Sequence, residues 1–234
     1  MALKTADARS TLPDRIVLYG VEGVGKTTWA AQARKPIFLC AEDGIRNLEA
    51  TKLLSPTGEA IRSWSDVMGA LEELLTEAHD FETLVIDTAD WLEPIIKNDV
   101  VNEHCKGSEA GFAAYGRGYD LAMGYWRKLL DALDRLREHR RMEIIMLAHA
   151  QLRAEESPSI GVEVKRFNMK IRGSDKCDPC AMIREWSDSF LFATFEEIKR
   201  EEDNGKTRGN PTGRRVLKTQ HAMMWRAKTR WKIP

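Results

Sequence analysis

Residues 20–29, GVEGVGKTTW, fit the phosphate-binding pattern G-x-x-x-x-G-K-[ST] at every fixed position. They follow a short apolar, β-rich run at 15–19 and lead into KTTWAAQAR (26–34), which is typical of a helix. In that context the backbone N–H groups of the turn and the helix N-terminus converge on phosphate oxygens. The stretch therefore predicts a P-loop at the start of an α/β domain.

The fixed positions of this loop predict ATP and Mg²⁺ as its ligands. Lys26 would reach the β- and γ-phosphates and act in catalysis, and the Thr27 hydroxyl would bind Mg²⁺. The residues predicted to contact the nucleotide are Gly20, Gly23, Val24, Gly25, Lys26, Thr27 and Thr28. A chance glycine-rich turn is the alternative, and the flanking strand and helix argue against it.

Two acidic residues outside the loop are candidates for the chemistry. Asp87 lies in TLVIDTAD (83–90), a predicted strand, and is expected to bind Mg²⁺ together with Thr27. It could instead cap a helix, which is the role expected of Asp90. Glu42 ends the predicted strand PIFLCAE and is the candidate base for the attacking water, unless Asp43 takes that role or both are solvated loop acids.

Strands alternate with helices along the chain, which predicts an α/β fold with a mostly parallel sheet covered on both faces. Strands are expected at 15–19, 36–42, 83–90 and 143–151, and helices at 26–34, 65–79 and 119–139. Ser65 is the expected N-cap of the second helix. The segments 189–197 and 214–220 flank Asp203-Asn204-Gly205 and predict a C-terminal antiparallel hairpin.

Two stretches, 104–118 and 152–176, show no regular pattern and are expected to be long loops with a functional role. The chain shows no internal repeat and no low-complexity linker. We therefore expect a short N-terminal extension, 1–13, and one core domain, 14–234.

The composition narrows the protein class. No apolar run is long enough to span a bilayer, the first residues lack the apolar block of a secretory signal, and four cysteines are too few for a disulfide framework. We expect a cytoplasmic protein with no membrane contact. The formal net charge is zero, but 42–103 holds 15 acidic and 4 basic residues and 199–234 holds 11 basic and 3 acidic ones. The basic end predicts either an anionic partner or contact with the acidic face of another copy.

Taken in order and spacing, these features resemble the RecA-type recombinase core, in particular that of small phage and prophage ATP-binding proteins. The likeness spans roughly residues 14–234. Besides the P-loop it rests on CAED (40–43), VIDT (85–88), YGRGYD (115–120), LAHAQ (147–151) and AKTRWKIP (227–234). It implies a RecA-like P-loop NTPase fold and Mg²⁺-dependent ATP hydrolysis that is weak or stimulated by DNA.

The resemblance also implies a γ-phosphate sensor at the end of the strand 143–151. His149 and Gln151 are the two candidates, and the sequence does not decide between them. The sensor would pass the state of the nucleotide to a segment that binds single-stranded DNA. A histidine that is merely hydrogen-bonded at a strand end is the alternative for His149.

In the resembling proteins, the segments that correspond to 104–118 and 152–176 bind single-stranded DNA. Cations of the second segment would follow the phosphates while an aromatic side chain stacks on a base. The residues predicted to bind DNA are Arg153, Lys165, Arg166, Phe167, Lys170 and Arg172. Four acidic residues share this segment, so an ordinary solvated loop remains the alternative.

Lys228 and Arg230 take the positions of two cations that, in the resembling proteins, reach the ATP of a neighbouring subunit. This implies a homo-oligomer, either a ring or a filament. The alternative is that both residues lie on the exposed face of a last strand. The implied partners are single-stranded DNA, further copies of the chain and a single-strand-binding protein.

The resulting hypothesis is an ATP-dependent single-stranded-DNA-binding protein that assists homologous recombination or strand annealing. A P-loop small-molecule kinase and a non-catalytic ATP-binding module that recruits another protein are the alternatives. Cys177 and Cys180 form a single C-x-x-C that could bind zinc with His104 and Cys105, but two unconnected thiols are the default expectation.

Overall fold

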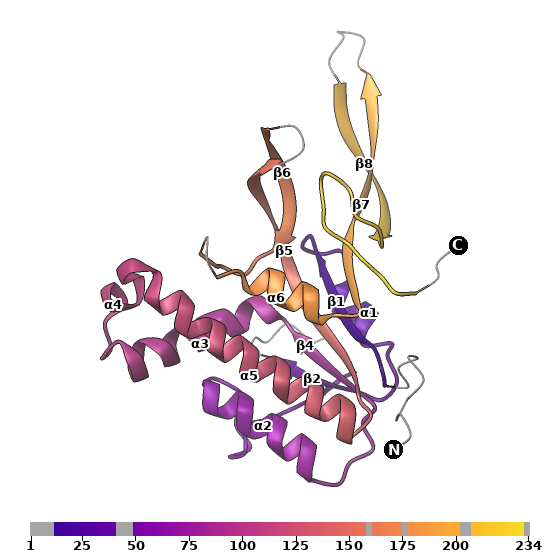
Figure 1. The fold of residues 1–234 in the computed structure, drawn as a ribbon. Helices are drawn as coiled ribbons and strands as arrows, with labels where there is room; N and C mark the ends of the chain where they lie inside the picture. The colour runs from indigo at the N-terminus through magenta and orange to yellow at the C-terminus, as the bar shows by residue number, and fades with distance from the viewer. Residues whose placement is uncertain (1–11, 41–48, 158–160, 175–176, 202–206, 232–234) are drawn as a thin grey trace, which may run out of the picture.

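The computed structural model describes residues 12–40, 49–157, 161–174, 177–201 and 207–231 (Figure 1). Within these residues, eight strands form one sheet in the order β3-β2-β4-β5-β1-β7-β8, with β6 paired to β5. The strands are β1 (Arg15–Gly20), β2 (Pro36–Cys40), β3 (Thr51–Lys52), β4 (Thr83–Asp87), β5 (Glu143–Ser157), β6 (Val162–Met169), β7 (Ser189–Glu201) and β8 (Thr207–Lys218).

The strand directions confirm the predicted α/β P-loop NTPase architecture. β1 runs parallel to β5 and β7, and β4 runs parallel to β2 and β5. The expected C-terminal hairpin is present as the antiparallel pair β7–β8, which is longer than the sequence suggested. Its expected turn, Asp203-Asn204-Gly205, lies outside the described residues.

The helices are α1 (Lys26–Ala30), α2 (Trp64–Thr76), α3 (Ala89–His104), α4 (Glu109–Ala113), α5 (Arg117–His139) and α6 (Pro179–Trp186), with a 3-10 turn at Ala114–Gly116. Alternate residues of β1 face two apolar layers. Val17 and Tyr19 pack with α2, α3, α5 and α6, whereas Ile16 and Leu18 pack on the other face with Ala30 of α1. The sheet is therefore buried on both faces, as a parallel sheet requires.

The helix α2 begins earlier than expected, so the Ser65 cap is wrong. Ser63 is the N-cap: its side chain accepts a hydrogen bond from the Asp66 backbone N–H (3.1 Å), and the Asp66 carboxylate accepts one from the Ser63 backbone N–H (2.9 Å). This reciprocal pair satisfies two backbone donors at once, which a Ser65 cap could not do. Val67, Leu71 and Leu74 form the buried face of the helix, which ends at Thr76 rather than at residue 79.

Helix α1 is shorter than the expected 26–34. From Gln32 onward the backbone bonds run from residue i to i−3, and the chain turns towards Pro36 at the start of β2. A residue that precedes proline disfavours the helical conformation, which helps to end the helix. The alanine-rich pattern of 26–34 carries no such stop signal of its own.

Both expected loops contain regular structure instead. The stretch 104–118 holds the end of α3, the short α4 and the start of α5. The stretch 152–176 is largely the antiparallel hairpin β5–β6, in which Arg153 pairs with Arg166 and Glu155 with Val164. Its strands alternate charged and apolar residues rather than forming an apolar run, so the pattern of a buried strand is absent.

The two hairpins, β5–β6 and β7–β8, extend from the same edge of the sheet (Figure 1). Their parent strands β5 and β7 lie on either side of β1. The P-loop after β1 therefore lies between the bases of the two hairpins. None of the helices in the described ranges is long and apolar enough to cross a lipid bilayer.

Candidate functional site

The P-loop lies at the carboxyl edge of the sheet, where β1 ends. Gly20 is in register with His149 on β5 and with Ala193 on β7, and on the far side of β5 the neighbouring β4 ends at Asp87. Ligands of open α/β sheets bind at this edge. The fold therefore gathers the loop, Asp87 and His149, which are distant in sequence, at one edge.

Two glycines of the loop are required by geometry. A Cβ at Gly20 would lie 2.4 Å from the carbonyl oxygen of Ala193, which is closer than non-bonded atoms approach. Gly25 has φ 90°, in the left-handed region that side chains disfavour. These constraints hold β1 against β7 and turn the chain sharply into α1.

Lys26 is enclosed by the loop and only 7% exposed. Its Nζ donates hydrogen bonds to the carbonyl oxygens of Gly20 and Val21, both at 3.1 Å. A buried ammonium group needs such acceptors, because desolvation without them would cost several kcal/mol, on the order of a pKa shift of several units. The lysine is thus held at the centre of the loop, where the predicted phosphates would lie.

Asp87 and Thr27 lie side by side, as the predicted metal site requires. Burial raises the pKa of Asp87 above its usual value, against the opposing effects of a hydrogen bond from the Thr27 side chain and the nearby charge of Lys26. A threonine hydroxyl and a carboxylate are oxygen donors of the kind that Mg²⁺ prefers. The donor set therefore fits a magnesium ion, which would also offset the cost of burying this carboxylate.

Asp90 does not act as a helix cap. Thr88 occupies the N-cap position of α3, and Asp90 lies in its first turn. One carboxylate oxygen of Asp90 accepts the backbone N–H of His149 and the other lies 2.8 Å from His149 Nδ1. Burial favours the protonated form, but the hydrogen bonds from His149 outweigh it and lower the pKa of Asp90.

The Asp90 carboxylate fixes the orientation of the His149 ring. Because an ionised carboxylate only accepts hydrogen bonds, the proton lies on Nδ1 and Nε2 is the nitrogen available to a ligand. Asp87 lies close enough to His149 to interact with it electrostatically. Gln151 is directed elsewhere: its amide donates to the carbonyl of Met169 on β6 at 3.0 Å.

Glu42, the candidate catalytic base, lies outside the described residues, as does Asp43. The strand that leads to them, β2, ends at Cys40 in register with Asp87. Strand β2 therefore ends at the same edge of the sheet as Asp87.

Lys228 and Arg230 lie away from the P-loop of their own chain. Lys228 pairs with Phe190 through two backbone hydrogen bonds of 2.8 Å, near the amino end of β7. Arg230 forms an ion pair with Asp188 (Nη1 to Oδ1, 3.0 Å). Burial and the positive charge of Arg230 lower the pKa of Lys228. Phe190 is in register with Val17 of β1, three residues before Gly20, where the P-loop begins.

The six residues predicted to bind DNA lie on or just after the β5–β6 hairpin. They differ in whether the side chain is already bonded within the protein or is exposed to solvent. Arg153 donates to the carbonyl of Ile171, and Arg166 pairs with Glu155 (3.0 Å) and donates to the carbonyl of Met223 (2.9 Å). The side chains that remain exposed are Lys165, Lys170 and Arg172. The first two arginines thus stabilise the hairpin, and the other three cations face solvent.

Phe167, the predicted stacking residue, is half-buried within an aromatic cluster. Its ring stacks on Phe192 at a centroid distance of 5.0 Å, and Phe192 in turn stacks on Trp225 at 6.1 Å. The Tyr19 hydroxyl, one residue before the P-loop, donates to the carbonyl of Arg226 (2.7 Å) and lies within 3.3 Å of that of Phe167. These contacts connect β1, the hairpin and the segment 219–231.

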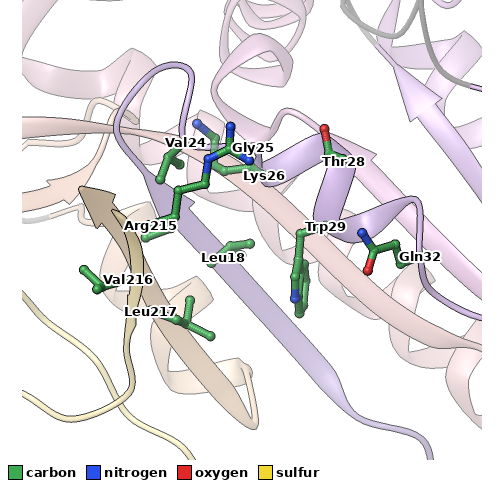
Figure 2. Close-up of a pocket in the computed structure, with 11 residues that line it drawn as sticks. Leu18, Val24, Gly25, Lys26, Thr28, Trp29, Gln32, Arg215, Val216 and Leu217 are labelled. Carbon is green, nitrogen blue, oxygen red and sulfur yellow. The ribbon is translucent and has the colours of Figure 1, made fainter. Parts of the chain in front are cut away.

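A cavity of about 320 Å³ opens beside the P-loop, between α1 and β8 (Figure 2). The P-loop side is formed by Gly25 and Lys26, and the opposite side by Arg215 and Leu217 of β8. Trp29 also lines it, and no local sequence pattern marks Trp29, Arg215 or Leu217 as part of a site. Only the pairing of β8 with β7 brings residues 190 positions downstream to the loop.

The cysteines do not form the zinc site considered from the sequence. Cys177 Sγ donates to Asp120 Oδ1 (2.7 Å), and Cys180 is buried, where desolvation raises its pKa to about 12. Among the described residues, no histidine or carboxylate joins the two cysteines as a further metal ligand, and no cluster of three or more His, Cys, Asp or Glu is suited to a metal ion. All four cysteines are free thiols.

A family model described as "AAA domain" matches residues 12–231 of the chain. The match includes the P-loop, β4 with Asp87, and both hairpins. A search of the curated proteins finds no match.

Proposed function

Since the chain belongs to the AAA domain family and carries its P-loop ATPase domain, we propose that it is an Mg²⁺-dependent ATPase whose nucleotide state controls the binding of single-stranded DNA. It would assist homologous recombination or strand annealing. The observation that carries this proposal is the position of the P-loop between two hairpins, one of which presents the exposed cations Lys165, Lys170 and Arg172.

Thr27 and Asp87 would hold the magnesium ion, and Lys26 would neutralise the phosphates. The ion held there would supply positive charge against the negative charge that develops on the transferred phosphoryl group. Glu42 remains the proposed base, which would take the proton of the attacking water.

We assign the γ-phosphate sensor to His149 rather than Gln151. His149 is in register with Gly20 and has its Nδ1 occupied by Asp90, so Nε2 can meet a phosphate oxygen. Gln151 is already engaged with Met169 across the hairpin. A shift of His149 towards bound ATP would move β5 directly, and β5 continues into the hairpin that carries the cations.

DNA binding would rest on Lys165, Lys170 and Arg172, because exposed cations lose little when they exchange water for phosphate. Arg153 and Arg166 would act mainly by holding the hairpin in shape, since their side chains are engaged within it. Phe167 would anchor the hairpin to the core unless DNA displaces its partner ring.

Lys228 and Arg230 would complete the ATP site of a neighbouring copy in a ring or filament. Their position away from their own P-loop supports this role, since a cation that acts in trans must lie on an outer face of its own subunit. Single-stranded DNA coated by a single-strand-binding protein would be the natural substrate of such an assembly.

The test is binding of a labelled single-stranded oligonucleotide at fixed low salt with Mg²⁺ and ATP, ADP or no nucleotide. We expect the tightest binding with ATP, and a loss of this dependence in Lys26→Ala. Removal of each exposed cation (Lys165→Ala, Lys170→Ala) should reduce the slope of log affinity against log salt by about 0.7.

The matched control is Lys128→Ala, which removes an exposed lysine on α5 that belongs to neither hairpin. It should leave the affinity and the slope unchanged. If no nucleotide state binds the oligonucleotide, DNA is not the ligand, and the kinase and recruitment functions take precedence.

A further inference from the structure

The cavity beside the P-loop has the form of a nucleoside site. Trp29 comes from α1 and Gln32 from the turn that follows it, while Leu217 lies on β8, so the walls belong to two distant parts of the chain (Figure 2). The volume of about 320 Å³ lies within the range of small-ligand pockets. The cavity adjoins Gly25 and Lys26 directly, so that one ligand could occupy the loop and the cavity together.

Two large apolar side chains are exposed at this cavity. Trp29 is 37% exposed and Leu217 43% exposed, and both line the space above Leu18. Exposed apolar surface in a concave site favours a flat, largely apolar ligand, and an indole ring can stack on a purine. The Gln32 amide can both donate and accept hydrogen bonds at the polar edge of such a ring.

Arg215 gives the cavity a charged end at the phosphate loop. A Cβ built at Gly25 would lie 3.0 Å from Arg215 Nη1, so the guanidinium rests against the loop backbone. Within the described ranges its side chain has neither an ion pair nor a hydrogen bond. The adjacent Arg214 instead lies 3.6 Å from the Glu196 carboxylate. A guanidinium without a carboxylate partner at a P-loop is suited to phosphate.

We propose that this cavity binds the nucleoside of a nucleoside triphosphate, with the base between Trp29 and Leu217 and with Arg215 on a phosphate oxygen in the same chain. The inference rests on nucleotide binding by the P-loop and is independent of DNA. It makes β8 part of the nucleotide site, so the nucleotide joins the P-loop to the β7–β8 hairpin. An apolar peptide would leave Arg215 and the phosphate loop without a ligand group.

The test compares two ligands, ATP and inorganic tripolyphosphate, by calorimetry with Mg²⁺ and without DNA. Tripolyphosphate has the phosphates of ATP and lacks the base, so it separates the two ends of the site. We expect Trp29→Ala to weaken ATP by about tenfold, the usual scale for loss of one stacked base, and to leave tripolyphosphate unchanged. Trp29→Phe should retain most of the ATP affinity.

Arg215→Ala should weaken both ligands by about tenfold, as expected for a lost charge-assisted contact, whereas the control Arg214→Ala should change neither. Retained tripolyphosphate binding by Trp29→Ala shows that this variant is folded. Unchanged ATP affinity in Trp29→Ala, or equal effects of the two arginine variants, would overturn the proposal while leaving the P-loop function intact. A wild-type protein that binds neither ligand would overturn both.

Discussion

At the scale of single residues, the distance between β1 and β7 depends on the absence of a side chain at Gly20. The Ala193 carbonyl and Cβ occupy the space that a Cβ would need. Both atoms belong to a paired strand of the core and cannot move aside cheaply. Residue 20 is therefore set by packing as well as by the phosphate loop.

We expect Gly20→Ala to reduce the free energy of unfolding by about 1–3 kcal/mol, the usual cost of overpacking. In the control, Gly124→Ala on α5, the new methyl group meets no atom within 4 Å. Its helical position should make that change neutral or stabilising by about 0.5–1 kcal/mol. Urea unfolding without nucleotide measures both, and equal stability of the two variants would contradict the close approach of β7.

The contribution of Asp188 to the stability of the fold also depends on the residues around it. It is 4% exposed and accepts three hydrogen bonds from Arg15, at 3.0 to 3.1 Å. Burial by itself would raise the pKa of Asp188, but the bonds and charge of Arg15 outweigh this and lower it. A carboxyl group whose pKa is lower in the folded than in the unfolded state stabilises the fold at pH values above the unfolded pKa, which is about 3.9. This stabilisation is lost as the pH falls through the pKa of the folded state.

We therefore expect Asp188→Asn to destabilise the protein by about 3 kcal/mol at pH 7, because Arg15 and Arg137 lose a buried partner. The difference from the wild type should shrink below about pH 4, where the Asp188 carboxylate of the unfolded wild-type chain begins to take up a proton while that of the folded protein, with its lowered pKa, stays ionised. Urea unfolding at pH 7, 5 and 3.5 measures this difference. A difference that stays constant over that range would contradict the proposed ion pairing.

At the scale of elements, helix α2 shows how a local signal fixes a boundary. Ser63 and Asp66 exchange side-chain and backbone hydrogen bonds, while Ser65 only contacts the Ser63 hydroxyl at 2.9 Å. The spacing Ser-x-x-Asp could have been read from the sequence as a capping box in which aspartate replaces glutamate. Ser65 is closer to the first apolar position of the repeating pattern, Val67, but its side chain does not cap the helix.

Ser63→Ala should cost about 1 kcal/mol of stability, as expected for a lost N-cap, whereas Ser65→Ala should cost less than about 0.5 kcal/mol. Thermal unfolding of the two variants gives the comparison on one helix. A larger loss of stability in Ser65→Ala than in Ser63→Ala would indicate that Ser65 is the N-cap.

The two hairpins show where element-level prediction succeeds and fails. The β7–β8 hairpin was predicted because β7 begins with the apolar run SFLFATF and a turn motif follows it. The strands of β5–β6 beyond Gln151 alternate charged residues, and their pairing depends on contacts such as Glu155 with Arg166 and Arg226. The sequence pattern does not indicate helix α3, because Pro94 interrupts it, although Leu92, Ile96 and Val100 are buried.

Across the molecule, the residues proposed to act on ATP lie in two separate places. The P-loop, Asp87 and Arg215 come from one chain, whereas Lys228 and Arg230 lie near the amino end of β7. In the proposed assembly, cations in that position would act on the nucleotide of a neighbouring copy. The acidic region 42–103 and the basic region 199–234 offer complementary charges for such contacts.

Complementation tests this arrangement. Lys26→Ala and the double variant Lys228→Ala/Arg230→Ala should each hydrolyse ATP slowly, and a 1:1 mixture should recover roughly a quarter of the wild-type rate in a head-to-tail assembly. The factor arises because half of the P-loops are intact and half of the neighbours supply the cations. The control mixes Lys26→Ala with the triple variant Lys26→Ala/Lys228→Ala/Arg230→Ala, and it must stay inactive because no P-loop is intact. If the first mixture recovers no ATP hydrolysis, action in trans is excluded.

Local sequence patterns are enough to predict the P-loop, Thr27 and Asp87 as the candidate metal ligands, the parallel core and the C-terminal hairpin. These depend on local patterns, in which residue type and spacing are set by the backbone conformation of one segment. The three-dimensional structure is needed to show that Asp90 orients His149, that Arg153 and Arg166 are engaged within their hairpin, and that Arg215 lies against Gly25. Each of these contacts joins segments far apart in the chain, and strand order, which no local pattern encodes, brings them together.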